Sequence, residues 1–273
     1  MDASRDAQVQ RRPVIKVTGR SRVREDDALA VERALSIRVD GRELAVTLRT
    51  PGFDEELAVG FLASEGVVSR SSDVTSVTPS SALCEDEADT ADVALAPGVV
   101  LDWTRLERNF AATASCGLCG RVHLDALRAG LTRVASSAVI PAEALLALPA
   151  RVREAQVTFT ETGGLHAAVW CDESLEPRVL REDVGRHNAV DKVCGWLMAA
   201  GLRPAPGGVL WVSGRAGAEL VLKAARAGIP VMAAVGAPSS LAVTLAEAAG
   251  MTLIGFLRDG RMNVYGGAER IGG

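Results

Sequence analysis

The chain has 273 residues, 48% hydrophobic and 23% charged, which is typical of a globular protein with a substantial core. Its 30 basic and 34 acidic residues give a formal charge of −4, which is no signature of a nucleic-acid-binding protein. No apolar run reaches membrane-spanning length, and the first residues lack the pattern of a secretory signal. Five cysteines, an odd number, favour a reducing compartment over a disulfide framework. We therefore expect a cytoplasmic protein with neither membrane nor nucleic-acid partners.

The first part of the chain predicts a tail and a small α+β subdomain. Residues 1–12 are polar and aperiodic, which predicts a disordered tail, and residues 13–108 are expected to form the subdomain. Its alternating runs meet at Asp40-Gly41, a dipeptide that favours a tight hairpin turn. The elements expected here are a short edge strand at Val14–Val17, strands at Val31–Val39 and Glu43–Leu48, a helix at Glu55–Ser64 capped by Asp54 and ended by Gly66, and strands at Val74–Thr78 and Asp92–Leu95.

The second part predicts an α/β domain over residues 141–273, after a cysteine-bearing loop and connection at 109–140. Strands that alternate with helices indicate a mostly parallel sheet with helices on both faces, and ligands bind such sheets at the carboxyl ends of the strands. The expected elements are a helix at Ala142–Leu148 with Pro141 in its first turn, a strand pair at Ala167–Cys171 and Arg178–Glu182, a helix at His187–Ala200, a strand at Val209–Val212, a helix at Ala218–Ala227, a strand at Val231–Val235, a helix at Leu241–Ala249, and strands at Thr252–Leu257 and Met262–Tyr265.

Two cysteines of the connection form the most reactive pattern in the chain, Cys116-Gly117-Leu118-Cys119-Gly120. Their spacing suits metal binding, disulfide exchange or persulfide transfer, and two cysteines that merely share a turn remain an alternative. A structural zinc site needs four ligands, and Cys84, Cys171, Cys194 and His123 are not spaced as a second pair. A thioredoxin-type pair would follow a strand and begin a helix, which this stretch does not predict. An accessible thiolate in a glycine-rich loop favours sulfur transfer.

Two turns that follow predicted strands, Ser213–Gly217 and Gly236–Ser240, are suited to an anion. Their glycines allow close backbone approach, and the helices that follow offer free N–H groups. Arg215 adds positive charge, and Ser239 or Ser240 can cap a helix or contact a phosphate. Ordinary strand-to-helix turns use the same residue types, so that alternative stays open for either turn alone.

The stretch Arg181–Lys192 holds six formally charged residues around a predicted helix start. Arg186, His187 and Asn188 fall at that start and are expected to face the same sheet edge as the two turns. A solvated helix terminus would be polar too, but the three segments together predict a polar pocket for a phosphate-bearing ligand.

This layout resembles the cytidine-deaminase-like fold, a three-layer α/β/α domain, here with a smaller N-terminal α+β subdomain. Zinc deaminases carry His-x-Glu at one helix start and Pro-Cys-x-x-Cys at the next. The corresponding positions here are His187-Asn188-Ala189, without Glu, and Ser213–Ala216, without a thiol. We therefore expect neither zinc nor another metal, which argues against the alternative of a zinc hydrolase.

With these residues in hand, the chain is similar to the formate dehydrogenase accessory sulfurtransferase family (FdhD-type). The stretch from Arg181 is far more specific than a Cys-x-x-Cys pair, and the resemblance leaves out only the tail and Ser80–Thr90. The segments that carry it are Gly60-Phe61-Leu62 with Glu65-Gly66, Ser115–Gly120, Thr162–Ala168, Arg181–Lys192, Ser213-Gly214-Arg215, Gly236–Ser240 and Gly255-Phe256-Leu257-Arg258.

The resemblance implies a homodimer that accepts sulfur from a cysteine desulfurase and carries it as a persulfide. The sulfur then passes to the molybdenum of the bis-molybdopterin guanine dinucleotide cofactor, which formate dehydrogenase needs for activity. Cys116 is expected to accept the sulfur, with Cys119 as relay or resolving thiol. A non-catalytic cofactor chaperone that binds the guanine dinucleotide remains the alternative.

The resemblance also implies a guanine-nucleotide pocket. His166 is expected to be satisfied by nearby backbone, and Cys84, Cys171 and Cys194 to be bystanders, the last two buried. The expected ligand-binding residues are Arg186, His187, Asn188, Ser213, Gly214, Arg215, Gly236, Ser239, Ser240, Phe256, Leu257 and Arg258.

Overall fold

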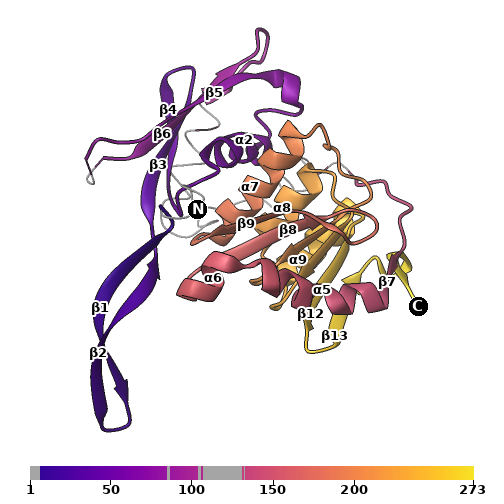
Figure 1. Ribbon diagram of the computed structural model, residues 1–273. Coiled ribbons are helices and arrows are strands. Elements are labelled where there is room, and N and C mark those ends of the chain that lie inside the picture. Colours follow the sequence, from indigo (N-terminus) through magenta and orange to yellow (C-terminus); the bar gives the residue numbers. More distant parts are fainter. Residues whose placement is uncertain (1–6, 85–86, 104–105, 107–130, 132) are drawn as a thin grey trace.

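The computed structural model describes residues 7–84, 87–103, 106, 131 and 133–273. Its described strands form two main sheets, and helices α2 and α7 pack against each other between them (Figure 1). No helix within these described ranges is long and apolar enough to cross a membrane.

The smaller sheet carries helix α2 on one face, where Leu57 and Leu62 of the helix pack with Leu35 of the sheet. Its first hairpin turns at Asp40 and Gly41, both with positive φ, as the sequence predicts. The two later predicted strands are confirmed as well. In spatial order the strands are β4 (Arg42–Arg49), β3 (Arg33–Val39), β6 (Asp89–Leu95) and β5 (Val74–Ser80), with the short 3-10 helix η1 at Ser71–Asp73.

Helix α2 (Asp54–Glu65) begins differently from the prediction, because its N-cap is Phe53 in the left-handed conformation, at φ 59°. The carboxylate of Asp54 instead accepts two hydrogen bonds from buried Arg49, at 2.8 and 2.7 Å. The prediction of Asp54 as the cap is wrong because this charge-assisted pair takes both carboxylate oxygens. Gly66 ends the helix at φ 79°, as predicted.

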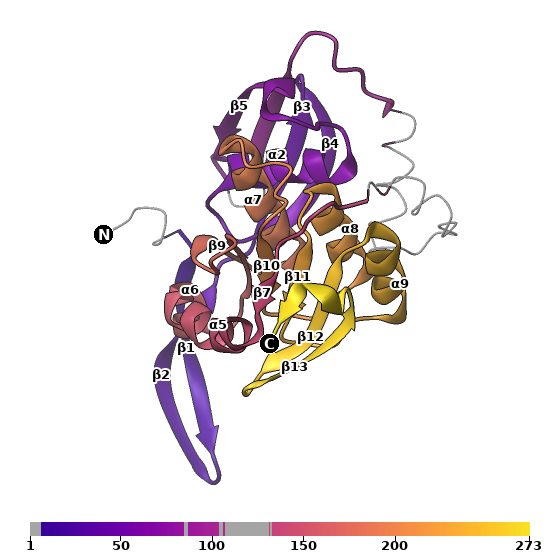
Figure 2. The same cartoon turned by 90° about the vertical axis from the view of Figure 1, so that its right-hand side faces the viewer.

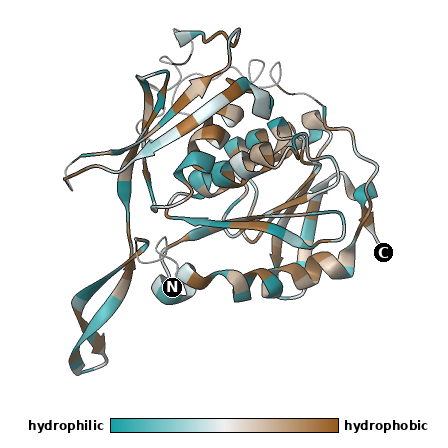
Figure 3. Cartoon of the chain, turned by 45° about the horizontal axis from the view of Figure 1, so that its top comes forward, coloured by the Kyte–Doolittle hydropathy of each residue, from teal (hydrophilic) through white to brown (hydrophobic). Residues whose placement is uncertain are grey.

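A long hairpin precedes the smaller sheet. Strands β1 (Val9–Thr18) and β2 (Ser21–Ala30) pair without interruption, from Val9 opposite Ala30 to Thr18 opposite Ser21. The prediction of a disordered tail is wrong for residues 9–12, and residues 1–6 lie outside the described part. The sequence pattern did not predict the full length of this hairpin. Most of its side chains are exposed on both faces, so no apolar alternation marks a buried face. Figure 3 shows hydrophilic and hydrophobic residues mixed along it.

The larger sheet is mixed rather than mostly parallel, which corrects the prediction. Only β10, β11 and β12 are parallel neighbours; β8 pairs antiparallel with β10 and with β9, and β13 pairs antiparallel with β12. The β8–β9 and β12–β13 pairs are hairpins, whose short connections permit only antiparallel neighbours. In spatial order the strands are β13 (Arg261–Gly266), β12 (Thr252–Arg258), β11 (Val231–Ala234), β10 (Val209–Val212), β8 (His166–Cys171) and β9 (Pro177–Asp183).

Helices cover both faces of this sheet, as predicted (Figure 2). Side chains alternate between the faces, so Leu210 packs with one helical layer and Trp211 with the other. The closer likeness to a cytidine deaminase stays a prediction. The helices are α7 (Arg186–Ala199), α8 (Ala218–Arg226) and α9 (Ser240–Ala249) on one face and α5 (Ala142–Ala155) on the other. The unpredicted elements are helix α6 (Val157–Thr162), the paired strands β7 (Ile140–Pro141) and β14 (Ile271–Gly272), and the 3-10 helix η2 (Ala268–Arg270).

Candidate functional site

The carboxyl ends of β10, β11 and β12 meet at one edge of the larger sheet, and the segments that leave them are hydrogen-bonded to one another. The Gly236 N–H donates to the Gly214 carbonyl at 2.9 Å, and the Phe256 N–H donates to the Gly236 carbonyl at 3.1 Å. The structure therefore brings the predicted turns Ser213–Gly217 and Gly236–Ser240 together, with the end of β12 beside them.

Glycine in these turns serves packing at some positions and leaves open space at another. A Cβ atom on Gly236 would lie 3.0 Å from the Gly214 carbonyl oxygen, and one on Gly255 would lie 2.7 Å from Cδ of Pro238. The nearest atom to a Cβ on Gly214 would be in the ring of His166, at 3.5 Å. Packing thus accounts for Gly236, whereas Gly214 keeps room for the close ligand approach that the sequence predicts.

Two of the predicted ligand serines already serve the fold. The Ala167 N–H donates to Ser213 Oγ at 2.9 Å, and the Ala242 N–H donates to Ser239 Oγ at 3.2 Å, which confirms Ser239 as the cap of α9. Because each hydroxyl oxygen accepts in these bonds, its proton remains for donation to a phosphate oxygen. Ser240, which begins α9, is exposed.

Exposed arginines lie at the same edge. Arg186 begins α7, Arg215 lies in the turn after β10, and Arg258 ends β12. Neither Arg186 nor Arg215 forms an ion pair with another residue of the described ranges, and Arg258 reaches Asp259 only at 3.9 Å. The N-termini of α7, α8 and α9 add the positive ends of three helix dipoles. This combination of charges favours an anionic ligand.

His187 and Glu219 connect α7 to α8 at this edge. Nε2 of His187 lies 2.7 Å from Oε2 of Glu219, and this hydrogen bond holds the pKa of Glu219 below its ordinary value. The sequence analysis missed Glu219, because an acidic residue in the first turn of a helix is common for dipole reasons alone. The contact orients the imidazole and leaves Nδ1 as the nitrogen that can meet a ligand.

His166, at the start of β8, is the other residue that the sequence analysis undervalued. It is half-buried, and it forms no hydrogen bond with the described residues, so the expectation that backbone satisfies it is wrong. Burial, and then the positive charges of Arg186 and His187, lower the pKa of His166. A neutral imidazole therefore faces the turn at Gly214. The Gly163-Gly164 pair just before it was the available sequence signal.

This shift predicts a pH dependence. The folded-state pKa of His166 lies below the unfolded value of about 6.5, so its contribution to stability is present above that pH and is lost as the pH falls below it. We expect the unfolding free energy of the wild type to fall more steeply from pH 7 to pH 5 than that of His166→Asn. Urea unfolding across this range measures the difference. Equal slopes, or an NMR pKa of 6.5 or higher for His166, would contradict the prediction.

Two predicted ligand residues are used by the fold instead. Asn188 is 8% exposed, and its amide donates to the Leu48 carbonyl at 2.8 Å and to Asp183 Oδ1 at 3.1 Å. Leu257 is fully buried in the core beneath α5. Neither side chain faces a ligand in this arrangement, so the residues that can act at the edge are the arginines, the serines, Gly214 and the two histidines.

The charged side chains of Arg181–Lys192 other than Arg186 are paired within the fold, some inside the larger part of the chain and some, such as Arg181 with Glu56, between its two parts. Of the three residues expected to face the sheet edge, Arg186 and His187 lie there, whereas Asn188 is held by the fold. A residue pattern shows charge, but not which element the charge meets. The contacts are Arg181 with Glu56 (2.6 and 2.7 Å), Asp183 with Lys192 (2.7 Å), Asp191 with Lys223 (2.7 Å) and Ser64 (2.6 Å), and Glu182 with the N–H groups of Thr158 and Phe159 (3.0 and 2.8 Å).

The predicted reactive thiols, Cys116 and Cys119, lie outside the described residues. Cys171 and Cys194 are buried as predicted, and burial raises the pKa of each thiol to about 12, so neither supplies a thiolate near neutral pH. Cys84 is exposed. Within the described ranges, no three His, Cys, Asp or Glu side chains gather as metal ligands.

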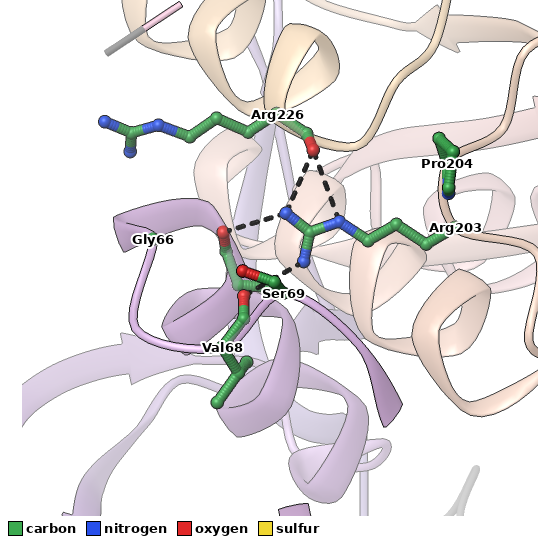
Figure 4. A pocket seen from close by; sticks show the side chains of 7 residues that line it. Gly66, Val68, Ser69, Arg203, Pro204 and Arg226 are labelled. Carbon is green, nitrogen blue, oxygen red and sulfur yellow. Dashed lines mark hydrogen bonds between the residues drawn. The ribbon is translucent and has the colours of Figure 1, made fainter. Parts of the chain in front are cut away.

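A pocket of about 240 Å³ lies apart from this edge, between the ends of α2 and α8 (Figure 4). The guanidinium of Arg203 crosses it and donates to the carbonyls of Ala63, Val68 and Arg226, at 2.9 to 3.3 Å. The Ala63 and Arg226 carbonyls sit at helix C-termini, where a cation is favoured, and that of Val68 lies in the segment after α2. Arg203 therefore stabilises the two helix ends.

The fold and the edge define a mixed α/β protein with a candidate anion site at the ends of parallel strands. A family model, the FdhD/NarQ family, matches residues 30–272. The chain belongs to this family.

Relatives support this assignment, and a solved structure shares the fold. The chain is 48% identical to "Sulfur carrier protein FdhD" of Streptomyces avermitilis over 96% of its own length and 95% of the relative. It is 47% identical to the protein of that name from Mycolicibacterium paratuberculosis, over 96% and 98% of the two chains. The crystal structure of a candidate formate dehydrogenase accessory protein from Desulfotalea psychrophila shares the fold, with a TM-score of 0.76, 22% identity, and 97% and 99% coverage.

Proposed function

We propose that the chain is a sulfurtransferase that accepts sulfur from a cysteine desulfurase as a persulfide and delivers it to the molybdenum of the bis-molybdopterin guanine dinucleotide cofactor, for activation of formate dehydrogenase. The observation that carries the proposal is membership of the FdhD/NarQ family, with relatives named sulfur carrier proteins aligned over nearly the whole chain. The Cys116 and Cys119 pair supplies the thiols that such a carrier needs.

The chemistry balances without an external oxidant. The Cys116 thiolate attacks the terminal sulfur of the donor's persulfide; a new S–S bond forms, the donor's S–S bond breaks, and the donor leaves as a thiolate. In delivery, the Cys119 thiolate attacks Sγ of Cys116 and releases the carried sulfur as hydrosulfide to the cofactor. The Cys116–Cys119 disulfide that forms accounts for the two electrons gained by the sulfur, and a cellular thiol resets the pair.

The sheet edge supports the cofactor half of the proposal. Guanine dinucleotide ends carry phosphates, and this edge offers exposed arginines, serine hydroxyl protons and helix N-termini. Arg186 and His187 would orient the phosphates, Arg215 would neutralise them, and Gly214 would let the backbone approach. The same proposal includes a homodimer in the cytoplasm, a deaminase-like ancestry for the larger sheet, and no bound zinc.

The test is intact mass after incubation with a cysteine desulfurase, cysteine and pyridoxal phosphate. We expect wild type to gain one sulfur atom that a reductant removes, and Cys116→Ser to gain none. Cys119→Ser should gain sulfur but fail to release it as hydrosulfide. Cys84→Ser, which removes an exposed thiol, is the matched control and should behave as wild type.

Two outcomes would contradict this scheme. Equal partial losses in Cys116→Ser and Cys119→Ser would overturn the division of roles between the thiols. No sulfur gain in any form would favour the cofactor chaperone, because the edge residues could still bind a guanine nucleotide without either thiol. Binding of GDP, measured by calorimetry on the variant that lacks both thiols, would then be the supporting observation for that alternative.

A further inference from the structure

His166 lies at the sheet edge with an imidazole that makes no hydrogen bond to the residues that the structure describes. Its backbone is fixed, because it begins β8 and lies opposite Asp183 of β9 in the antiparallel register. A neutral imidazole carries one donor and one acceptor nitrogen, and polar groups taken partly out of water are usually satisfied. The half-buried ring therefore has both of its nitrogens to offer to a ligand.

The ring of His166 borders the turn that follows β10. A Cβ atom added to Gly214 would have Nδ1 and Cε1 of this ring as its nearest neighbours, at 3.5 and 3.7 Å. The backbone next to His166 is tied to the same turn, since the Ala167 N–H donates to Ser213 Oγ at 2.9 Å and the Ser213 N–H donates to the Ala167 carbonyl at 3.0 Å. The imidazole thus faces the open space at Gly214 from a fixed strand, which suits a ligand contact.

Charged groups face His166 from two neighbouring elements. Arg186 and His187 act on it from the start of α7, and Asp183 acts on it from the end of β9. Asp183 is already paired with buried Lys192, at 2.7 Å. Burial, and then the positive charges on α7, hold the pKa of His166 below its ordinary value. An anion bound beside the ring would supply the countercharge that favours the protonated form.

We propose that His166 is a direct contact of a pyrophosphate group bound in the space at Gly214, and that its imidazole takes up a proton from solvent as this group binds. The inference rests on the guanine-dinucleotide site of the proposed function, and it gives a role there to a residue that the site otherwise leaves unused. The N–H bond is the only covalent bond that forms, and its proton comes from water or buffer. The imidazolium then donates a charge-assisted hydrogen bond to a phosphate oxygen.

The other cations of the edge do not share this behaviour. Arg186 and Arg215 keep their charge at every physiological pH. Nε2 of His187 already has a partner, Oε2 of Glu219 at 2.7 Å. His166 is therefore the contact whose strength follows the pH and the charge of the ligand. It selects for the phosphate end of a nucleotide, because an uncharged base stabilises an imidazolium far less than a pyrophosphate does.

The test is isothermal titration calorimetry of the full chain with GDP-mannose, whose pyrophosphate is a diester and does not itself titrate near neutral pH. Titrations in buffers of different ionisation enthalpy count the protons taken up with the ligand. We expect wild type to take up a fraction of a proton at pH 7, and its affinity to rise about tenfold from pH 8 to pH 6, because the bound anion raises the pKa of His166. His166→Asn should lose the uptake and most of this pH dependence.

His187→Asn is the matched control, because it removes a histidine of the same edge that already has Glu219 as its partner. It should keep the proton uptake, whatever its affinity. Guanosine, which lacks the pyrophosphate, should bind wild type at least about tenfold more weakly at pH 6, since it cannot form the charge-assisted bond. NMR titration of the wild type checks the same point without a variant: the pKa of His166 should rise when GDP-mannose is added.

Each contrary result has its own meaning. Proton uptake that persists in His166→Asn, or that is lost in His187→Asn instead, would overturn the role of His166 and leave the nucleotide site standing. An NMR pKa of His166 that GDP-mannose does not change would do the same. A wild type that fails to bind GDP-mannose would overturn the guanine-nucleotide site of the proposed function and this inference together. These measurements require neither thiol nor sulfur, so they are independent of the sulfur-transfer test.

Discussion

Replacement of Gly60 by alanine is expected to lower the free energy of unfolding by about 3 kcal/mol or more, a large part of the stability of an ordinary domain. Helices α2 and α7 cross at this residue with their backbones in direct contact. A Cβ atom on Gly60 would lie 1.8 Å from the carbonyl oxygen of Asp191, and one on Gly195 would lie 1.9 Å from that of Glu56. Because both obstacles are backbone atoms, neither can rotate away, and the helices would have to separate.

Urea unfolding monitored by circular dichroism measures this effect. Gly195→Ala should behave like Gly60→Ala, since it opens the same crossing. Gly164→Ala is the matched control, because its nearest neighbours would be the Cβ of Ala30 at 3.5 Å and the Thr162 carbonyl oxygen at 3.9 Å, both ordinary contact distances. A loss at Gly60 no larger than that of the control would show that the helices do not cross as closely as described.

Replacement of Lys192 by methionine is expected to cost about 3–5 kcal/mol, because it leaves the carboxylate of Asp183 buried without its countercharge. Both side chains are fully buried, 2.7 Å apart. Burial lowers the pKa of Lys192, and the charge of Asp183 opposes that shift. Each buried charge therefore depends on the other to remain ionised. Asp183 also accepts hydrogen bonds from the Thr50 and Gly185 N–H groups, which fixes its position between the two parts of the chain.

The double variant Asp183→Asn/Lys192→Met separates charge from packing. It should recover part of the stability lost in Lys192→Met, since no unpaired charge remains. Arg178→Met is the control ion pair: Arg178 lies 2.6 Å from Asp172 but is 58% exposed, and pairs of that kind contribute little. If Lys192→Met were as mild as Arg178→Met, the pair would have to be open to water.

Local signals in the sequence located most of the elements. The Asp40-Gly41 turn fixed the hairpin of β3 and β4, and the apolar run Val209–Val212 coincides with β10. Gly66 was recognised as a helix end, and Ser239 was one of two candidate caps, because capping depends on residues within one turn. The convergence of the turns after β10 and β11 was predictable as well, since parallel strands end at the same edge.

What the sequence could not reveal depends on contacts between distant residues. In the sequence, Arg181 and Asp191 are only charges near a predicted helix start, and their roles appear once Glu56 and Lys223 are placed opposite them. Asn188 likewise looks like a ligand contact until the carbonyl of Leu48 is seen to hold its amide. The antiparallel placement of β8 beside β10 was equally invisible, because residues 166–171 carry the same buried pattern in either direction.

The crossing of α2 and α7 also constrains how the protein can be made. Gly60 and Gly195 are 135 positions apart in the chain, so α2 leaves the ribosome long before its partner exists. At translation rates of about 5–20 residues per second, the wait is roughly 7–27 s. During that interval Glu56, Ser64 and the Gly60 face of α2 have no counterpart. During synthesis, α2 therefore has only the small sheet against which to pack its apolar side chains until α7 has been made.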